Sequence, residues 1–169
     1  HREFLEFNED QHSELKQYSK GKGIVYFCTP CDIVSLQMLE SLNVPFYKVA
    51  SRDLTNIPLL EEMGKINKPV IISTGMALNK DIEDAVKALN LKKNKLIIMH
   101  CTSQYPCDLE NVNLKVIKTL RNKYGYLTGY SDHTSGIIVS VAASLMGACV
   151  IEKHITLNRS LKGTDQAGS

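Results

Sequence analysis

The feature that most constrains this chain is a regular alternation of short apolar runs with longer helical patterns. The runs are rich in β-branched residues and lack strict alternation, which is typical of parallel strands buried on both faces. Strands separated by single helices indicate βα units and a parallel sheet. We therefore predict an α/β fold with strands at Ile24–Cys28, Phe46–Ala50, Val70–Thr74, Lys95–His100, Tyr126–Tyr130 and Ala148–Glu152.

The segments between these runs carry apolar stripes at helical spacing. Leu114, Ile117 and Leu120 share one face of a predicted helix, and Gly125 follows as its stop signal. The segment Ile137–Leu145 is apolar nearly all round, which predicts a well-buried helix. Two architectures remain open: an open doubly wound sheet, or a (β/α)₈ barrel of which two units are missing.

Composition excludes several classes of function. The chain has 169 residues, room for one domain with a sizeable core. Its net charge is +2 and no basic block stands out, so we expect no nucleic-acid partner. No apolar run approaches the roughly 18 residues of a membrane span, and the first residues lack the apolar core of a secretion signal. The five scattered cysteines indicate a reducing, cytoplasmic setting.

The residues at the carboxyl ends of the predicted strands are unusually polar. In parallel α/β sheets, active sites lie at these ends. The polar segments are Cys28–Pro30, Lys48–Asp53, Ser73–Gly75, His100–Pro106, Gly129–Thr134 and Glu152–His154. The loops that lead back into the strands carry no such concentration, so we expect a functional site at the carboxyl edge.

Two histidines follow neighbouring predicted strands. Because parallel strands end at the same edge, His133 and His154 are expected to lie side by side. Two imidazoles without a third His or Cys nearby suit an open divalent metal site that water or substrate completes. The alternative is that each ring only forms hydrogen bonds there, and we favour the metal site.

Lys48 ends an apolar strand, where a buried ammonium is costly unless an anion pairs with it. That anion is either Asp53 or a phosphate or carboxylate of a ligand. Hydroxyl groups near the other strand ends would add hydrogen bonds to the same ligand oxyanion. They belong to Thr29, Ser51, Ser103 and Ser131.

Cys28 and Cys31 form a CxxC motif, which in a cytosolic α/β protein can be a redox pair. A second CxxC that would complete a zinc site is absent from the sequence, and the motif adjoins a predicted buried strand. We therefore favour a structural role over redox chemistry.

Six motifs in order along the chain resemble the sialic acid synthase family, which includes spore-coat polysaccharide and other nonulosonic acid synthases. They read YFCTP, YKVASRDLTNIPLL, VIISTGM, MHCTSQYPCDLENVNL, GYSDHTSGI and VIEKHITLNRSLKGTD, and the resemblance runs from Gly23 to Ser169. It implies condensation of phosphoenolpyruvate with an N-acetylated hexosamine, such as N-acetylmannosamine, to a nonulosonic acid and phosphate. The reaction is a metal-assisted C–C bond formation with C–O cleavage of phosphoenolpyruvate.

The resemblance also implies a fold and a partner. The family fold is a (β/α)₈ TIM barrel followed by a small antifreeze-like domain, in a homodimer. Residues 1–169 would then form a single partial barrel domain covering about strands 3 to 8. The first two βα units, with a glutamate base and a further phosphate-binding lysine, and the C-terminal domain would lie outside it. We therefore expect this stretch to be inactive alone.

The matching motifs carry over residue roles. His133 and His154 match the metal-binding pair, with Mn²⁺ expected and Mg²⁺ or Co²⁺ as alternatives, and Lys48 joins them as a catalytic residue. The positions that match phosphoenolpyruvate contacts are Thr29, Lys48, Ser51, Ser103 and Ser131. The positions that match the surroundings of the amino sugar are Asp53, Tyr105 and Asp165.

Two departures from the family pattern motivate alternatives. Arg52 stands where the motif usually has glycine, and Gln166 stands where it usually has histidine. One alternative is therefore a non-catalytic metal- or anion-binding barrel remnant. Another is a different phosphoenolpyruvate-dependent sugar acid synthase, which we rank lower because these motifs are not typical of it.

Overall fold

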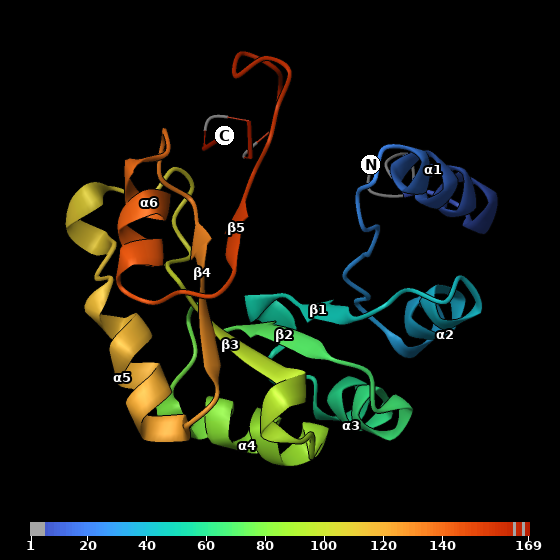
Figure 1. The fold of residues 1–169 in the computed structure, drawn as a ribbon, viewed down its shortest axis with the longest axis horizontal. Helices are drawn as coiled ribbons and strands as arrows, with labels where there is room; N and C mark the ends of the chain where they lie inside the picture. The colour runs from blue at the N-terminus through green and yellow to red at the C-terminus, as the bar shows by residue number, and fades with distance from the viewer. Residues whose placement is uncertain (1–5, 164, 167) are drawn as a thin grey trace.

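The computed structural model describes residues 6–163, 165–166 and 168–169. Its strands form one parallel sheet in the order β1-β2-β3-β4-β5, the order of the chain. The strands are β1 (Tyr47–Val49), β2 (Val70–Ser73), β3 (Leu96–Cys101), β4 (Leu127–Asp132) and β5 (Ile151–Lys153). The sheet curves like part of a barrel wall, as the α/β prediction requires (Figure 1).

One helix connects each pair of consecutive strands and lies on the outer side of the curved sheet (Figure 1). The helices are α1 (Glu9–Gly21), α2 (Ile33–Ser41), α3 (Ile57–Ile66), α4 (Asn79–Leu89), α5 (Lys115–Tyr124) and α6 (Ile138–Leu145). Short 3₁₀ turns occur at η1 (Ser51–Asp53), η2 (Lys93–Lys95) and η3 (Leu109–Asn111). A helix between each pair of strands returns the chain to the start of the sheet, which allows neighbouring strands to run parallel.

Side chains alternate between the two faces of each strand. On β1, Tyr47 and Val49 belong to the apolar core shared with α3 and α4, whereas Lys48 between them lines a cavity. On β4, Tyr130 packs in a second apolar cluster and Ser131 lines the cavity. We call the helix-covered side the outer face and the cavity side the inner face.

Local signals in the sequence explain where the elements begin and end. Asp32 caps α2, because its carboxylate accepts a hydrogen bond from the Ser35 backbone N–H at 2.7 Å. Gly125 ends α5 in the left-handed conformation, with φ of 69°, which confirms the predicted stop.

The first predicted strand, Ile24–Cys28, is wrong. These residues have no regular secondary structure and belong to no sheet, and Ile24 and Val25 are exposed. Phe27 contacts Phe46 with ring centroids 4.3 Å apart, so the segment lies beside the start of β1 without forming a strand ladder. An apolar run indicates that a segment can be buried, but a strand also needs a neighbouring strand to which it forms hydrogen bonds.

The predicted helix at Ile137–Leu145 exists, but the prediction that it is well buried is wrong. Only Val139 and Ala143 of α6 are buried, whereas Ile138 and Leu145 are more than 80% exposed. The physical reason is that β4 and β5 cover one side of α6, and no described element covers the other.

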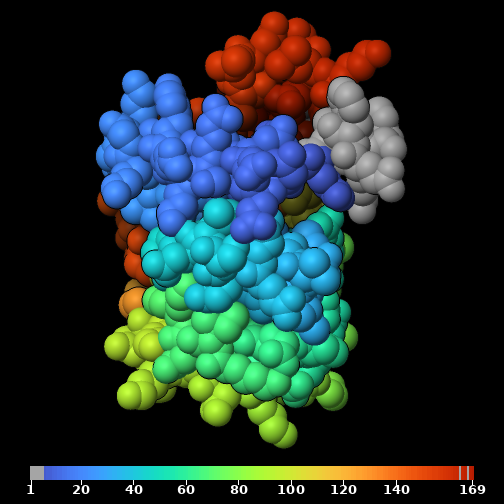
Figure 2. All heavy atoms as spheres, turned by 90° about the vertical axis from the view of Figure 1, so that its right-hand side faces the viewer, coloured from blue at the N-terminus to red at the C-terminus, as the bar shows by residue number. Residues whose placement is uncertain are grey.

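The N-terminal helices stack beside the sheet. Figures 1 and 2 both place α1, α2 and α3 in one column, and the Lys16 ammonium donates to the Leu42 carbonyl at the end of α2. Among the helices that the structure describes, none has the length and apolar composition required to cross a bilayer.

Candidate functional site

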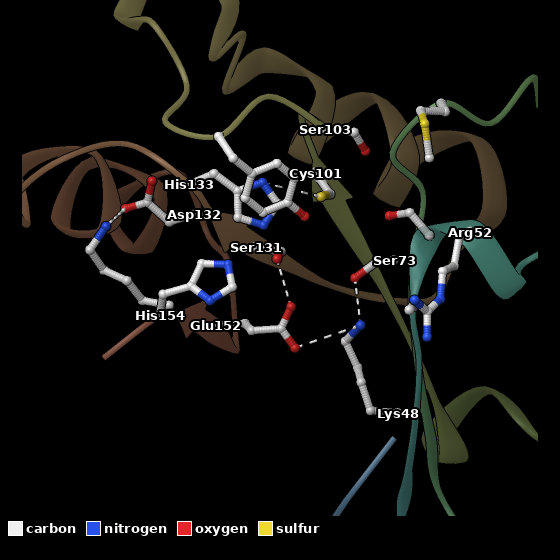
Figure 3. A pocket seen from close by; sticks show the side chains of 15 residues that line it. Lys48, Arg52, Ser73, Cys101, Ser103, Ser131, Asp132, His133, Glu152 and His154 are labelled. Carbon is white, nitrogen blue, oxygen red and sulfur yellow. Dashed lines mark hydrogen bonds and ion pairs between the residues drawn. The ribbon is translucent and has the colours of Figure 1, made fainter. Parts of the chain in front are cut away.

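A cavity of about 580 Å³ opens at the carboxyl ends of the strands, on the inner face. Its lining comes from all five strands and the loops that follow them (Figure 3). The lining residues are Lys48, Ala50, Ser51, Arg52, Ser73, Met76, Cys101, Ser103, Tyr105, Ser131, Asp132, His133, Glu152, Lys153 and His154. Its volume lies within the range typical of small-molecule sites.

Lys48 is the buried cation of this cavity, with only 4% of its surface exposed. Its ammonium donates to the Ser73 hydroxyl at 2.7 Å and to the Val49 carbonyl at 2.9 Å, and it lies 3.6 Å from Glu152. Burial lowers the pKa of Lys48, and the negative charge of Glu152 opposes that shift. Asp53 is therefore not its partner: the carboxylate that balances Lys48 is Glu152.

Three further hydroxyl groups, those of Ser51, Ser103 and Ser131, line the same cavity as Lys48. Ser51 accepts a hydrogen bond from the Gly75 backbone N–H at 3.0 Å. A Cβ at Gly75 would lie 2.8 Å from the Ser51 hydroxyl and 2.3 Å from the Ser103 hydroxyl, so a side chain at this position would displace both hydroxyls. Ser131 donates to Glu152 at 2.6 Å. This part of the cavity thus combines a buried cation with several hydroxyl groups, as an anion site requires.

The two predicted imidazoles lie together on the other side of the cavity (Figure 3). The ring centroids of His133 and His154 are 5.3 Å apart. The Nδ1 atom of His133 lies 2.7 Å from the Thr102 carbonyl oxygen, which can only accept. Nδ1 therefore carries the proton, and the lone pair is on Nε2. A fixed tautomer of this kind is what a metal-ligating histidine needs.

Tyr105 and Cys101 complete the imidazole side. The Tyr105 ring stacks on His133 at 4.0 Å between centroids and meets His154 edge-on at 5.7 Å. The Cys101 sulfur lies 4.0 Å from Nδ1 of His133, and burial raises the pKa of its thiol. Cys101 is therefore a neutral wall of the cavity rather than a nucleophile.

Three of the predicted site residues do not line the cavity within the described part of the chain. Thr29 lies before α2, and Asp53 accepts from Nε of Arg52 at 3.3 Å. The Asp165 carboxylate lies 4.0 Å from Nε2 of His154, beside the cavity, in a motif whose Thr164 is outside the described residues. The substrate roles assigned to these three residues stay predictions.

Sequence reasoning assigned no site role to five polar members of the cavity, and two of them, Glu152 and Ser73, lie beside Lys48. Both side chains alternate toward the cavity along their strands, so Glu152, two residues before His154, could have been predicted to lie on the same side as that histidine. The pairing of Glu152 with Lys48 was not predictable, because it joins β5 to β1 across the curved sheet.

The two histidine nitrogens are compatible with binding of a divalent ion whose remaining coordination positions are filled by substrate or water. Among the described residues, no group of three or more His, Cys, Asp and Glu side chains has the arrangement of a closed metal site. His133 and His154 supply two nitrogen donors, and the oriented lone pair of His133 suits one coordination position.

A curved parallel sheet with outer helices and a polar cavity at its strand ends defines the class of this chain: a partial TIM barrel with a barrel-mouth site. The sequence matches the NeuB family over residues 1–169. The chain belongs to the NeuB family, which confirms the resemblance to sialic acid synthases.

Several relatives are similar to this chain over nearly its whole length. An uncharacterized protein of Methanocaldococcus jannaschii is 46% identical over 96% of this chain and 49% of its own. The N,N'-diacetyllegionaminic acid synthase of Campylobacter jejuni is 40% identical over 98% of this chain and 50% of its own. The human N-acetylneuraminate-9-phosphate synthase is 40% identical over 100% of this chain and 47% of its own. The chain therefore spans about half the length of these relatives.

Solved structures agree on the fold. The N-acetylneuraminic acid synthetase of Leptospira borgpetersenii, in complex with citrate, superposes with a TM-score of 0.90 at 42% identity, over 95% of this chain and 56% of that one. A truncated 3-deoxy-D-arabino-heptulosonate 7-phosphate synthase of Thermotoga maritima superposes with a TM-score of 0.80 at 18% identity, which shows the barrel fold alone.

Proposed function

We propose that the protein carrying this chain condenses phosphoenolpyruvate with an N-acetylated hexosamine to give a nonulosonic acid and inorganic phosphate. The observation that carries the proposal is the division of one cavity into an anion side around Lys48 and an imidazole side around His133 and His154. Membership of the NeuB family, whose relatives include synthases of three such acids, supports the same reaction class.

The anion side suits phosphoenolpyruvate. Lys48 supplies a buried positive charge, and the Ser73 hydroxyl that accepts from it keeps its own proton to donate to a ligand oxygen. Ser103 and Ser131 add hydroxyls to the same wall. Donors that are already held in place stabilise the phosphate as it gains charge on leaving, without reorganisation.

The imidazole side suits the sugar aldehyde. His133 and His154 would hold a divalent ion, for which we propose Mn²⁺. Such an ion would act as a Lewis acid toward the aldehyde oxygen. The Thr102 carbonyl fixes the ring of His133, and Tyr105 restrains its tilt by stacking on it.

The reaction balances as follows. The enol carbon of phosphoenolpyruvate forms a bond to the aldehyde carbon, and the aldehyde oxygen takes up a proton as it becomes a hydroxyl. Water adds to the carbon that bears the phosphate and gives up one proton, which balances the proton taken up by the aldehyde oxygen. The tetrahedral intermediate expels phosphate by C–O cleavage, its hydroxyl proton goes to the departing phosphate, and a keto group remains. Lys48 and its hydroxyl neighbours bind the departing phosphate in this scheme.

The test is phosphate release from phosphoenolpyruvate by the full natural reading frame, supplied with Mn²⁺ and N-acetylmannosamine. We expect release that depends on the sugar, and a product whose mass equals both substrates plus water minus phosphoric acid. Reactions without sugar are the control. No release with this sugar, nor with a panel of related N-acetyl sugars, would favour the non-catalytic binding remnant instead.

A further inference from the structure

The CxxC motif of Cys28 and Cys31 takes no part in the proposed reaction. A structural role was expected because the motif adjoins a predicted buried strand, but residues 24–28 belong to no sheet. Cys31 is exposed, whereas Cys28 is partly buried and packs against the apolar core. Asp32, the N-cap of α2, follows Cys31 directly. The loop before α2 therefore holds an accessible thiol and a partly buried thiol, separated by two residues.

A cation lies against the exposed thiol. The Nη2 atom of Arg52 donates a hydrogen bond to the Cys31 sulfur at 2.8 Å, and its Nε atom donates to Asp53 at 3.3 Å. Asp53 therefore helps to hold the guanidinium beside the sulfur. Reactive cysteines occur in such accessible positions beside a positive charge, because the sulfur is negatively charged when it attacks.

The three other cysteines lack this arrangement. Cys101 and Cys107 are buried, and burial raises the pKa of both thiols. Cys149 is exposed, as Cys31 is, but among the described residues no cation contacts its sulfur. Exposure alone therefore does not distinguish Cys31. The guanidinium and the second cysteine of the motif do.

The position of Cys28 suits a thiol that reacts second. Burial raises the pKa of Cys28, and the charge of Cys31 adds to that shift, so the two sulfur atoms lie within electrostatic reach of each other. The Cys31 sulfur also lies 4.0 Å from the Thr29 carbonyl oxygen, on the loop that leads back to Cys28. A protonated thiol is a poor first nucleophile, but it can resolve a mixed disulfide on a neighbouring cysteine.

We propose that Cys31 and Cys28 form a reversible thiol–disulfide site whose oxidant is a low-molecular-weight disulfide. Cys31 gives up its proton to solvent, its sulfur attacks one sulfur of that disulfide, and the first small thiol leaves. Cys28 then gives up its proton and attacks the Cys31 sulfur of the mixed disulfide, which releases the second small thiol. The two protein thiols lose two electrons and two protons, and the small disulfide gains them as it becomes two thiols.

Oxidation at this site changes the surroundings of the cavity. Arg52 lines the cavity beside its entrance to the Lys48 side (Figure 3), and the Cys31 sulfur is one of its hydrogen-bond acceptors. A sulfur in a disulfide carries no negative charge, so its hold on the guanidinium weakens. The site therefore links the redox state of two thiols to a cation that borders the cavity.

The test is reaction of the full natural reading frame with oxidised glutathione, followed by peptide mass spectrometry. We expect the glutathione adduct to form at Cys31 at least tenfold faster than at Cys149, the exposed control, and then to give way to a Cys28–Cys31 disulfide. Cys28→Ser should trap the adduct on Cys31, and Cys28→Ala provides a second variant if serine disturbs the core. Arg52→Gln should slow the reaction of Cys31 at least threefold and leave that of Cys149 unchanged.

Three outcomes would overturn the inference. Equal rates at Cys31 and Cys149 would show that exposure alone accounts for the reactivity. An adduct that persists on Cys31 of the wild type would show that Cys28 does not resolve it. An unchanged rate at Cys31 in Arg52→Gln would remove the guanidinium from the site. None of these measurements uses turnover, so they stand or fall independently of the proposed function.

Discussion

The inner and outer faces of the sheet contain the same kind of polar pair in opposite roles. On the inner face, the lysine is buried and its carboxylate partner, Glu152, is 39% exposed to the cavity. On the outer side of β4, toward α6, the side chain of Asp132 has no exposed surface, and Lys153 lies 3.4 Å away. These two residues also border the cavity at the strand ends. Both pairs join a lysine to an acid with serine hydroxyls nearby, so residue type alone does not distinguish them.

The difference lies in how completely each acid is bonded within the protein. Asp132 accepts hydrogen bonds from the Thr134 backbone N–H at 2.9 Å, the Thr134 hydroxyl at 2.7 Å and the Ser140 hydroxyl of α6 at 2.5 Å. It therefore ties β4 to α6 and the loop between them. Glu152 instead faces open space that a ligand can enter. The comparison shows that a buried carboxylate whose hydrogen-bonding capacity is filled within the protein supports the fold. A carboxylate beside the cavity that still has capacity to accept hydrogen bonds can instead interact with a ligand.

The largest expected effect is the loss of the outer-face acid. Asp132→Ala leaves Lys153, Thr134 and Ser140 without their shared acceptor, and should lower the free energy of unfolding by about 3–5 kcal/mol. Urea denaturation of the full natural reading frame measures it. The inner-face counterpart, Glu152→Ala, should cost less than half as much because Glu152 is partly exposed. Equal losses in the two variants would break the comparison.

The next effect concerns the imidazoles. His133→Ala or His154→Ala should weaken Mn²⁺ binding more than tenfold, because each removes one of two proposed protein ligands. Titration followed by electron paramagnetic resonance measures the affinity. The matched control is His100→Gln on the outer face, whose Nε2 contacts the Val112 carbonyl at 2.7 Å. That variant should lose stability and keep its Mn²⁺ affinity, and an unchanged affinity in both inner-face variants would exclude the two-histidine site.

A smaller effect is expected for single hydroxyls. Thr128 on the outer face has a buried hydroxyl without a hydrogen-bond partner among the described residues. Thr128→Val should therefore stabilise the protein by about 1 kcal/mol, with an unchanged KM for phosphoenolpyruvate. Ser73→Ala, on the inner face, should raise that KM several-fold, because Ser73 lies beside Lys48. Thermal unfolding and initial-rate kinetics test both, and a raised KM in the Thr128 variant alone would contradict the assignment of faces.

The smallest effect is the acid dependence of stability. Burial alone would raise the pKa of Asp132, but hydrogen bonds from Ser140 and Thr134, with the charge of Lys153, hold it below its ordinary value of 3.8. A depressed folded-state pKa stabilises the protein above the unfolded value, and that stability is lost as pH falls through the folded value. Wild-type stability should therefore fall more steeply below about pH 4 than that of Asp132→Asn. Parallel slopes in urea unfolding would remove Asp132 as the cause.

Much of this arrangement was predictable because it depends on local pattern. The apolar runs located β1 to β5, and their order gave the parallel sheet with a polar carboxyl edge. The position of His133 beside His154 followed from neighbouring strands. What failed depended on partners that no local pattern records. Ile24–Cys28 lacks a strand neighbour, and α6 lacks an element over its second side.

The site shows the same limit. The sequence marked Lys48 as a buried cation in need of an anion, but its partner was predictable only from the curvature that brings β5 toward β1. Asp53 was an attractive candidate because it is near in the chain, and it contacts Arg52 instead. Long-range charge pairs are set by tertiary geometry, which a run of neighbouring residues does not encode.

The most direct test compares the two lysines, Lys48→Met and Lys153→Met, in the full natural reading frame. Phosphoenolpyruvate affinity by calorimetry and the free energy of unfolding in urea are measured on both variants. The account predicts that Lys48→Met binds phosphoenolpyruvate at least tenfold more weakly with little change in stability, since removing a desolvated charge offsets the lost pair. Lys153→Met should lose more than about 1 kcal/mol of stability and keep its affinity, because the Lys153 ammonium, although it borders the cavity, is already bonded to Asp132 and to the Thr134 carbonyl. Normal affinity in Lys48→Met, with the loss found in Lys153→Met, would contradict the division of the sheet into a chemical and a structural face.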